Sequence, residues 1–221
     1  MWAKVCANTN LDDALLATEL GADALGFVFA ESRRQVTAAQ VARITSHLPE
    51  HIETVGVFNS RDANEIAGIM RQAGLDTVQL HGGLDPGLSL RLQELLGSNI
   101  GLIQTLHWVA DGSADSRQTV AHQLEEIQRA GTIDRVLVDS RVGQASGGTG
   151  VTFDWKAAGK VFAGRNGGLR IIAAGGLRPD NLAEAIALMR PWGVDVASGV
   201  EATAGRKDPI KLAEFLRIAK S

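Results

Sequence analysis

Short apolar runs alternate with longer amphipathic runs along the whole chain, and this alternation limits the possible folds more than any other feature. The short runs are typical of buried strands, and the longer runs are typical of helices with one apolar face. Repeated strand–helix units favour a parallel sheet covered by helices. We count eight units, each of about 25 to 30 residues, and eight such units close into a barrel. An open, doubly wound sheet is the alternative, but units of nearly equal length favour closure. We therefore expect an α/β fold, a (β/α)8 TIM barrel with residues 1–221 in a single domain.

The expected strands and helices follow from the positions of these runs. Thr37 and Gln40 form a capping-box pattern at the start of the second helix, and Pro179 fits the first turn of the seventh. The segment 107–116 is polar, and we expect it to be irregular. The strands are expected at 4–6, 23–29, 52–58, 76–80, 100–105, 135–139, 169–174 and 194–196, and the best-defined helices at 11–21, 86–96, 118–130 and 208–219.

Composition excludes several classes of protein. Hydrophobic residues make up 45% of the chain and charged residues 21%, as in an ordinary soluble globular protein. A net charge of −3 gives no electrostatic reason to expect binding to nucleic acid or to an anionic membrane. No apolar run is long enough to span a membrane, and the N-terminus lacks the apolar core of a secretory signal. The single cysteine cannot form an internal disulfide, so we expect a cytoplasmic protein.

Polar and glycine-rich residues follow most of the expected strands. In a barrel of this type the carboxyl ends of the strands and the loops after them form the active face, so these residues should lie around one opening. They are Cys6, Arg34, His81, Asp139, Gly147 to Gly150, Gly175, Gly176, Ala197, Ser198 and Gly199.

The glycine loops after the last two strands predict a phosphate site. Gly175 and Gly176 precede a helix, and Ser198 and Gly199 follow the final strand. Backbone N–H groups and a helix N-terminus at this place in a barrel favour an anion. The loop containing Gly148 could extend the same cradle. Glycines that only permit tight turns, with no ligand, are the alternative.

Cys6 and Asp139 are candidates for acid–base chemistry. A lone buried cysteine is usually a small apolar residue. At a strand end facing a phosphate pocket, however, it could act as a thiolate, which would require its pKa to be lowered from about 8.5. Asp139 ends an apolar strand, which is a costly place for a carboxylate. It could be a helix cap or a salt-bridged group, or an acid whose pKa is raised toward neutrality.

Three other polar residues have structural interpretations, and Arg34 has a functional one as well. Arg34 could lie on a solvated loop or could bind a substrate carboxylate through two parallel hydrogen bonds. His81 could be a pocket-wall imidazole, and Asp195 could be a structural hydrogen-bond acceptor. We expect no metal site, because the five histidines are scattered and one cysteine cannot anchor a zinc centre.

Short motifs occur along the whole chain, each weak alone. They are Lys4-Val5-Cys6 with Thr9, Gly26-Phe27-Val28-Phe29, Ser32 with Arg34, Val55-Gly56-Val57-Phe58, Val78-Gln79-Leu80-His81-Gly82, Gly147-Gly148-Thr149-Gly150 with Phe153-Asp154-Trp155, Gly175-Gly176-Leu177 with Pro179 and Asn181, and Asp195-Val196-Ala197-Ser198-Gly199-Val200-Glu201. Taken together, and in this order, these motifs resemble the phosphoribosylanthranilate isomerase family.

The resemblance implies an Amadori rearrangement in tryptophan biosynthesis, which converts N-(5-phosphoribosyl)anthranilate into a 1-deoxyribulose phosphate without metal or organic cofactor. It implies that Cys6 is the general base and Asp139 the general acid. It also implies that Arg34 holds the anthranilate carboxylate and that the two glycine loops hold the phosphate. The expected partner is therefore a small phosphorylated substrate, with the chain a monomer or a homodimer.

Three positions depart from the family pattern. Ala7 stands where the family usually has glycine, and it would be strained if the backbone needs a positive φ. The loop before Arg34 is one residue shorter than usual and lacks Tyr-Pro, and Ala197 replaces a serine beside the phosphate loop.

Two other functions compete with this one. The first is the histidine-pathway sugar isomerase, a similar phosphate-binding barrel. Its chemistry resembles that of paired aspartates at the first and fifth strand ends. This chain has Cys6 and Thr105 at those ends, which argues against that function. A barrel that binds a phosphorylated metabolite or a partner protein without turnover is the non-enzymatic alternative.

Overall fold

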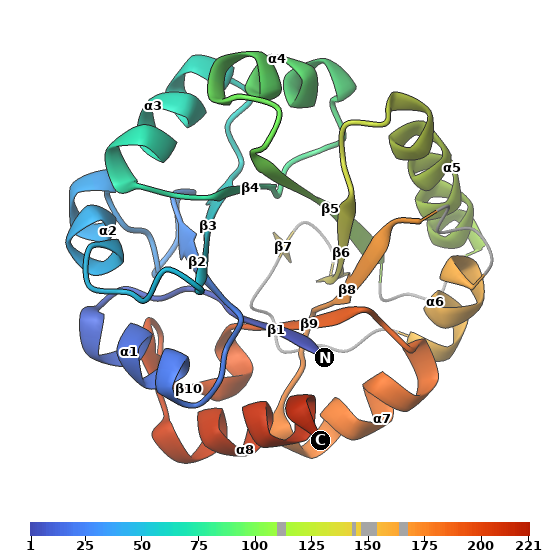
Figure 1. The fold of residues 1–221 in the computed structure, drawn as a ribbon. Coiled ribbons are helices and arrows are strands. Elements are labelled where there is room, and N and C mark those ends of the chain that lie inside the picture. Colours follow the sequence, from blue (N-terminus) through green and yellow to red (C-terminus); the bar gives the residue numbers. More distant parts are fainter. Residues whose placement is uncertain (110–113, 143–144, 147–153, 164–167) are drawn as a thin grey trace.

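A closed ring of eight parallel strands, surrounded by helices, forms the molecule (Figure 1). The computed structural model describes residues 1–109, 114–142, 145–146, 154–163 and 168–221. Strands pair in the order β5-β4-β3-β2-β1-β9-β8-β6, and pairing of β5 with β6 closes the ring. The expected (β/α)8 barrel is therefore confirmed.

The strands of the ring are short, and their register is parallel throughout. Short strands suffice because each is buried on both faces, between the ring interior and the helices. They are β1 (Trp2–Val5), β2 (Ala24–Val28), β3 (Glu53–Phe58), β4 (Thr77–Leu80), β5 (Gly101–Val109), β6 (Arg135–Val142), β8 (Arg170–Ala173) and β9 (Gly193–Val196).

The helices begin at local capping signals that the sequence contains. Thr37 and Gln40 form the expected capping box, and Asn10, Asp62, Asp85 and Asp208 each cap a helix through the side chain. The helices are α1 (Leu11–Glu19), α2 (Ala38–Thr45), α3 (Ala63–Ala73), α4 (Pro86–Leu96), α5 (Ala114–Ala130), α6 (Trp155–Phe162), α7 (Pro179–Met189) and α8 (Pro209–Lys220). Among the described helices, none is both long and apolar enough to cross a membrane.

The core has two parts. The larger part fills the space between the sheet and the helices, and the smaller part fills the ring interior with small and branched residues. Successive side chains along a strand point to opposite faces of the sheet. Lys4 and Cys6 are two residues apart, so they lie on the same face at β1. Lys4 therefore belongs to the ring interior, one layer below the opening that Cys6 lines.

Two expected strand ends were wrong. The fifth strand does not stop at Thr105 but runs to Val109, and the sixth does not end on Asp139 but runs to Val142. The two strands pair with each other over this extension, with His107 opposite Asp139, and Trp108 is almost fully buried. Pairing between distant segments thus gives regular structure to residues 107–109, which we had expected to be irregular.

Two short hairpins were not predicted from the sequence. Strand β7 (Ala145–Ser146) folds back on the end of β6. After β9, a 3-10 turn η1 (Ser198–Val200) leads into β10 (Glu201–Thr203), which pairs antiparallel with β11 (Arg206–Lys207). This second hairpin lies beside the loop that follows β1, and it contributes charged residues to the site.

Candidate active site

A cavity of about 230 Å³ opens at the carboxyl ends of the strands. It brings together nine of the ten predicted site residues from six separate segments of the chain. They are Cys6, Arg34, His81, Asp139, Gly175, Gly176, Ala197, Ser198 and Gly199. The tenth, Gly148, lies outside the described residues, as does the rest of its glycine loop.

Cys6 continues the line of β1 into the cavity. Its N–H donates to the Val196 carbonyl at 2.8 Å, and its side chain lines the cavity although the residue is only 7% exposed. Burial raises the pKa of the Cys6 thiol, which is opposite to the lowering that a resting thiolate would need. The neighbouring ammonium of Lys4 counters this effect and lowers the pKa, while Asp195 raises it.

The backbone turns sharply directly after Cys6. Ala7 has a φ of 62°, in the left-handed region that glycine adopts easily and alanine does not, so the strain expected at this departure is present. Asn8 anchors the turn, because its N–H donates to the Gly26 carbonyl at 3.0 Å and its side-chain amide donates to the Val5 carbonyl at 2.8 Å. These contacts hold the turn and, with it, the direction of the Cys6 side chain.

Asp139 is buried on the β6 side of the cavity. Burial raises its pKa to about 7, and the nearby Asp195 carboxylate adds to the rise. The Ser140 backbone N–H and the Lys4 ammonium act in the opposite direction but do not outweigh burial. Asp139 is therefore protonated in a large fraction of molecules near neutral pH, as a general acid must be.

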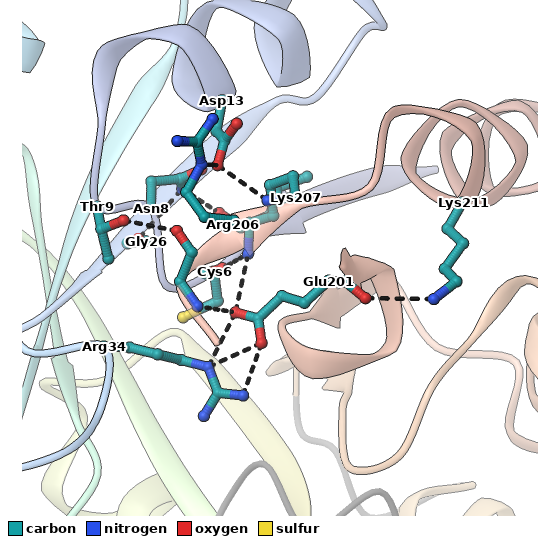
Figure 2. Close-up of polar contacts among 12 residues, drawn as sticks. Cys6, Asn8, Thr9, Asp13, Gly26, Arg34, Glu201, Arg206, Lys207 and Lys211 are labelled. Atoms are coloured by element: carbon teal, nitrogen blue, oxygen red, sulfur yellow. Dashed lines mark hydrogen bonds and ion pairs between the residues drawn. The ribbon is translucent and has the colours of Figure 1, made fainter. Parts of the chain in front are cut away.

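Arg34 reaches the cavity from the loop after β2 and forms a double hydrogen bond with Glu201 (Figure 2). Its Nε donates to Glu201 Oε1 at 2.9 Å, and its Nη2 donates to Oε2 at 2.7 Å. The Glu201 side chain is 5% exposed and that of Arg34 is 21% exposed, so the carboxylate is largely removed from water and the guanidinium less so. Hydrogen bonding from Arg34 and the charge of Lys207 overcome the effect of burial and lower the pKa of the Glu201 carboxyl.

Lys207, from β11, links the hairpin to the turn after β1 (Figure 2). Its Nζ donates to the Cys6 carbonyl at 2.5 Å and lies 3.7 Å from Glu201 Oε1. Its backbone N–H donates to Asp13 in α1 at 2.9 Å. No role was predicted for Glu201 or Lys207 from the sequence, because neither lies at the end of an expected strand.

Two glycine loops form the rim of the cavity on the side of β8 and β9. Gly175 and Gly176 have φ angles of 76° and 67°, and a side chain at Gly175 would collide with the Ser140 backbone. A side chain at Gly199 would collide with the Leu177 carbonyl. Asn181, in the first turn of α7, donates to the Gly176 carbonyl at 3.0 Å. Glycine is thus required here for backbone geometry, and the two loops pack against each other next to a helix N-terminus.

His81, His107 and Asp139 form the grouping best suited to hold a metal in the part of the chain that the structure describes. Each offers one ligand atom, and the three atoms lie within 4.8 Å of one another. Sequence spacing did not reveal this grouping, because the three residues come from three segments of the chain, at β4, β5 and β6. Burial, together with His107 and Lys4, lowers the pKa of His81 to about 4, so its imidazole is neutral. A cation bound here would occupy the Asp139 carboxylate.

Comparison with known proteins agrees with this geometry. A family model described as N-(5'-phosphoribosyl)anthranilate (PRA) isomerase matches residues 3–217. An N-(5'-phosphoribosyl)anthranilate isomerase from Pelobacter propionicus is 44% identical over 218 residues, which are 98% of this chain and 94% of that one. The chain belongs to the N-(5'-phosphoribosyl)anthranilate isomerase family.

Solved structures of the family have the same fold over the full length. The phosphoribosyl anthranilate isomerase from Thermotoga maritima superposes with a TM-score of 0.84 at 33% identity, covering 100% of this chain and 98% of that one. A phosphoribosyl anthranilate isomerase in complex with reduced 1-(o-carboxyphenylamino)-1-deoxyribulose 5-phosphate superposes with a TM-score of 0.80 at 31% identity, with the same coverage of both chains. The resemblance seen in the sequence motifs is therefore confirmed.

Proposed function

We propose that the cavity carries out the isomerisation typical of the family, with Asp139 as general acid and Cys6 as general base. Membership in the family makes the chain an isomerase of tryptophan biosynthesis. The observation that carries the residue roles is the placement of both groups in one cavity, with the pKa of Asp139 raised to about 7.

Two separate proton transfers complete the rearrangement of N-(5'-phosphoribosyl)anthranilate. Protonated Asp139 donates to the furanose ring oxygen as the bond from C1 to that oxygen breaks, and an iminium ion forms. The Cys6 thiolate then removes the proton from C2, which the iminium makes acidic, and tautomerisation of the resulting enolamine gives the ketone. An acid and a base on opposite sides of one opening suit these two steps.

The remaining residues bind and orient the substrate. Glu201 engages Nε and Nη2 of Arg34, and the guanidinium retains the donors of Nη1 for the anthranilate carboxylate. The loops at Gly175–Gly176 and Ala197–Gly199 offer backbone N–H groups to the phosphate, and Gly148 is proposed for the same cradle. His81, being neutral, fits a role as a hydrogen-bonding wall of the pocket.

The proposal includes one catalytic domain over residues 1–221, a single small phosphorylated substrate and no metal or organic cofactor. The proposal includes no binding to nucleic acid or membrane. We expect the chain to be a monomer or a homodimer, located in the cytoplasm. A phosphoribosylantranilate isomerase from Thermotoga maritima has been described as dimeric, and mass measurement in solution would decide the state of this chain.

An assay of phosphoribosylanthranilate isomerisation tests the function directly. We expect turnover by the wild type and a loss of about 10² to 10⁴-fold in kcat for Cys6→Ser and for Asp139→Asn. Asp12→Asn, which changes an exposed carboxylate in the first turn of α1, is the matched control and should keep full activity. A wild type without turnover would contradict the function, and full activity in either site variant would contradict the role of that residue.

A further inference from the structure

Lys4 is a charged residue in the interior of the barrel to which the proposed mechanism gives no role. Its side chain is fully buried, and its Nζ forms an ion pair with Asp195 Oδ1 at 2.8 Å. A buried ammonium is costly even when it is paired, and an apolar residue in its place is often no less stable. Stability alone therefore does not account for a lysine at this position.

The ammonium of Lys4 lies beside the thiol of Cys6. Both side chains project from the same face of the chain at β1 toward Gly26 of the neighbouring β2. A Cβ atom placed on Gly26 would be 2.7 Å from Cys6 Sγ and 3.1 Å from Lys4 Nζ. Glycine at position 26 thus leaves open the space into which both the thiol and the ammonium project.

We propose that Lys4 is the positioning residue that makes Cys6 available as a base, by stabilising the thiolate next to its ammonium group. Asp195, paired with Lys4 from β9, sets the strength of this effect by offsetting part of the positive charge. This inference rests on the proposed role of Cys6, and it adds a residue that acts through the base and does not touch the substrate.

The other charges around Cys6 are consistent with this role. Lys207 contacts the Cys6 carbonyl, and Arg34 and Glu201 lie further out, paired with each other. Burial lowers the pKa of Lys4, but Asp195 and Cys6 outweigh burial, and the net pKa lies well above its ordinary value. Lys4 therefore keeps its charge well beyond neutral pH. For Cys6, Lys4 is the strongest influence that opposes burial, ahead of Lys207.

The thiol can be titrated without turnover, because the chain has one cysteine and no tyrosine. Ultraviolet absorbance of the thiolate and the rate of alkylation by iodoacetamide, each measured against pH, both report the pKa of Cys6 alone. We expect Lys4→Met to move both curves upward by about 1 to 3 pH units, the usual effect of an opposite charge at contact. We expect Asp195→Asn to move them downward, because a charge that raises the pKa is removed.

The pH profile of kcat/KM gives the second readout. The reactive form needs protonated Asp139 and ionised Cys6, so the profile should be bell-shaped, with limbs near pH 7 and at the higher pKa of the thiol. In Lys4→Met the alkaline limb should shift to higher pH by more than the acid limb does. The maximum should fall roughly tenfold for each unit by which the two limbs separate.

Two further variants keep the test decisive. Lys160→Met removes an exposed lysine on α6 and should leave both readouts unchanged. If Lys4→Met does not fold, Lys4→Met combined with Asp195→Asn removes the unpaired carboxylate, and its thiol pKa should still exceed that of the wild type. The proposal would be overturned if the titration curve of Lys4→Met coincided with that of the wild type. A downward shift of the thiol pKa in Lys4→Met, alone or combined with Asp195→Asn, would also overturn it. A wild type without isomerase activity would instead overturn the proposed function, since the thiol titration does not depend on turnover.

Discussion

The two sides of the barrel opening hold their reactive groups in different ways. On the side of β1, β9 and the β10–β11 hairpin, Cys6 is surrounded by paired charges: Lys4 with Asp195, and Lys207 and Arg34 with Glu201. On the side of β6, Asp139 is buried, and the strongest influence on its pKa besides burial is another carboxylate, that of Asp195.

This difference matches the opposite needs of an acid and a base. Burial disfavours the charged form of both groups and raises both pKa values. For Asp139, the proposed acid, that shift is sufficient, because an acid must hold its proton near neutral pH. For Cys6, the proposed base, the same shift works against the proposed role, because a base must lose its proton. We infer that only the base side needs buried cations, and three variants test this contrast.

Breaking the Arg34–Glu201 pair should have the largest effect. Glu201→Gln leaves the guanidinium without a carboxylate partner, and we expect a loss of about 3 kcal/mol in the free energy of unfolding, measured with urea. Because Arg34 would also lose its fixed orientation, KM for phosphoribosylanthranilate should rise by roughly tenfold with a smaller change in kcat.

The ion pair at the other end of the barrel is the matched control. Glu53 Oε1 and Arg135 Nη1 lie 2.7 Å apart at the amino ends of the strands, away from the cavity. Glu53→Gln should also destabilise the fold but leave KM unchanged. Equal changes of KM in the two variants would show that Glu201 acts only through stability.

The sequence was sufficient for the barrel and for the positions of most site residues. Apolar periodicity and local caps are encoded within a few residues, so α4 was predicted at the bounds observed, and most strand positions were correct to within two residues. The strand-end rule then placed Cys6, Arg34, His81 and Asp139 around one opening.

Contacts between distant segments could not be predicted in this way. Lys207 and Cys6 are 201 residues apart, and Arg34 and Glu201 are 167 apart. The extension of β5 likewise depends on its partner β6. Lys4 is the exception, because a lysine two residues before Cys6 in an apolar strand faces the same side, and that spacing was visible in the sequence.

Replacing Asp139 by Asn should have an intermediate effect on the free energy of unfolding. We expect a gain in stability, in contrast to the loss expected for Glu201→Gln. The pKa of Asp139 is about 7 in the folded protein and about 3.9 in an unfolded chain, so the wild type loses stability as pH rises through this interval. Asp139→Asn has no carboxylate to ionise, and we expect it to be more stable than the wild type by on the order of 2 kcal/mol at pH 8. The two proteins should converge near pH 4, as thermal unfolding at both pH values would show.

Asp139→Asn separates stability from activity, because it should be more stable than the wild type at pH 8 while losing activity. A gain in stability that is the same at pH 4 and pH 8 would mean that the ionised carboxylate is not the cause. A loss at pH 8 would mean that Asp139 is held by stabilising charges, as Cys6 is.

The smallest effect is expected at Ala7. The left-handed conformation costs alanine about 1 to 2 kcal/mol, but Ala7→Gly would also lose a buried methyl group and gain freedom in the unfolded chain. These terms nearly cancel, so we expect a change in stability within about 0.5 kcal/mol and unaltered kcat. Arg190, at the C-terminus of α7, also has a positive φ, of 49°, but it is exposed and has no buried methyl to lose. Arg190→Gly should therefore gain about 0.5 to 1 kcal/mol in urea unfolding. An equal gain at Ala7 would show that packing of its methyl contributes nothing, and that the contacts of Asn8 and Lys207 alone hold the turn that directs Cys6.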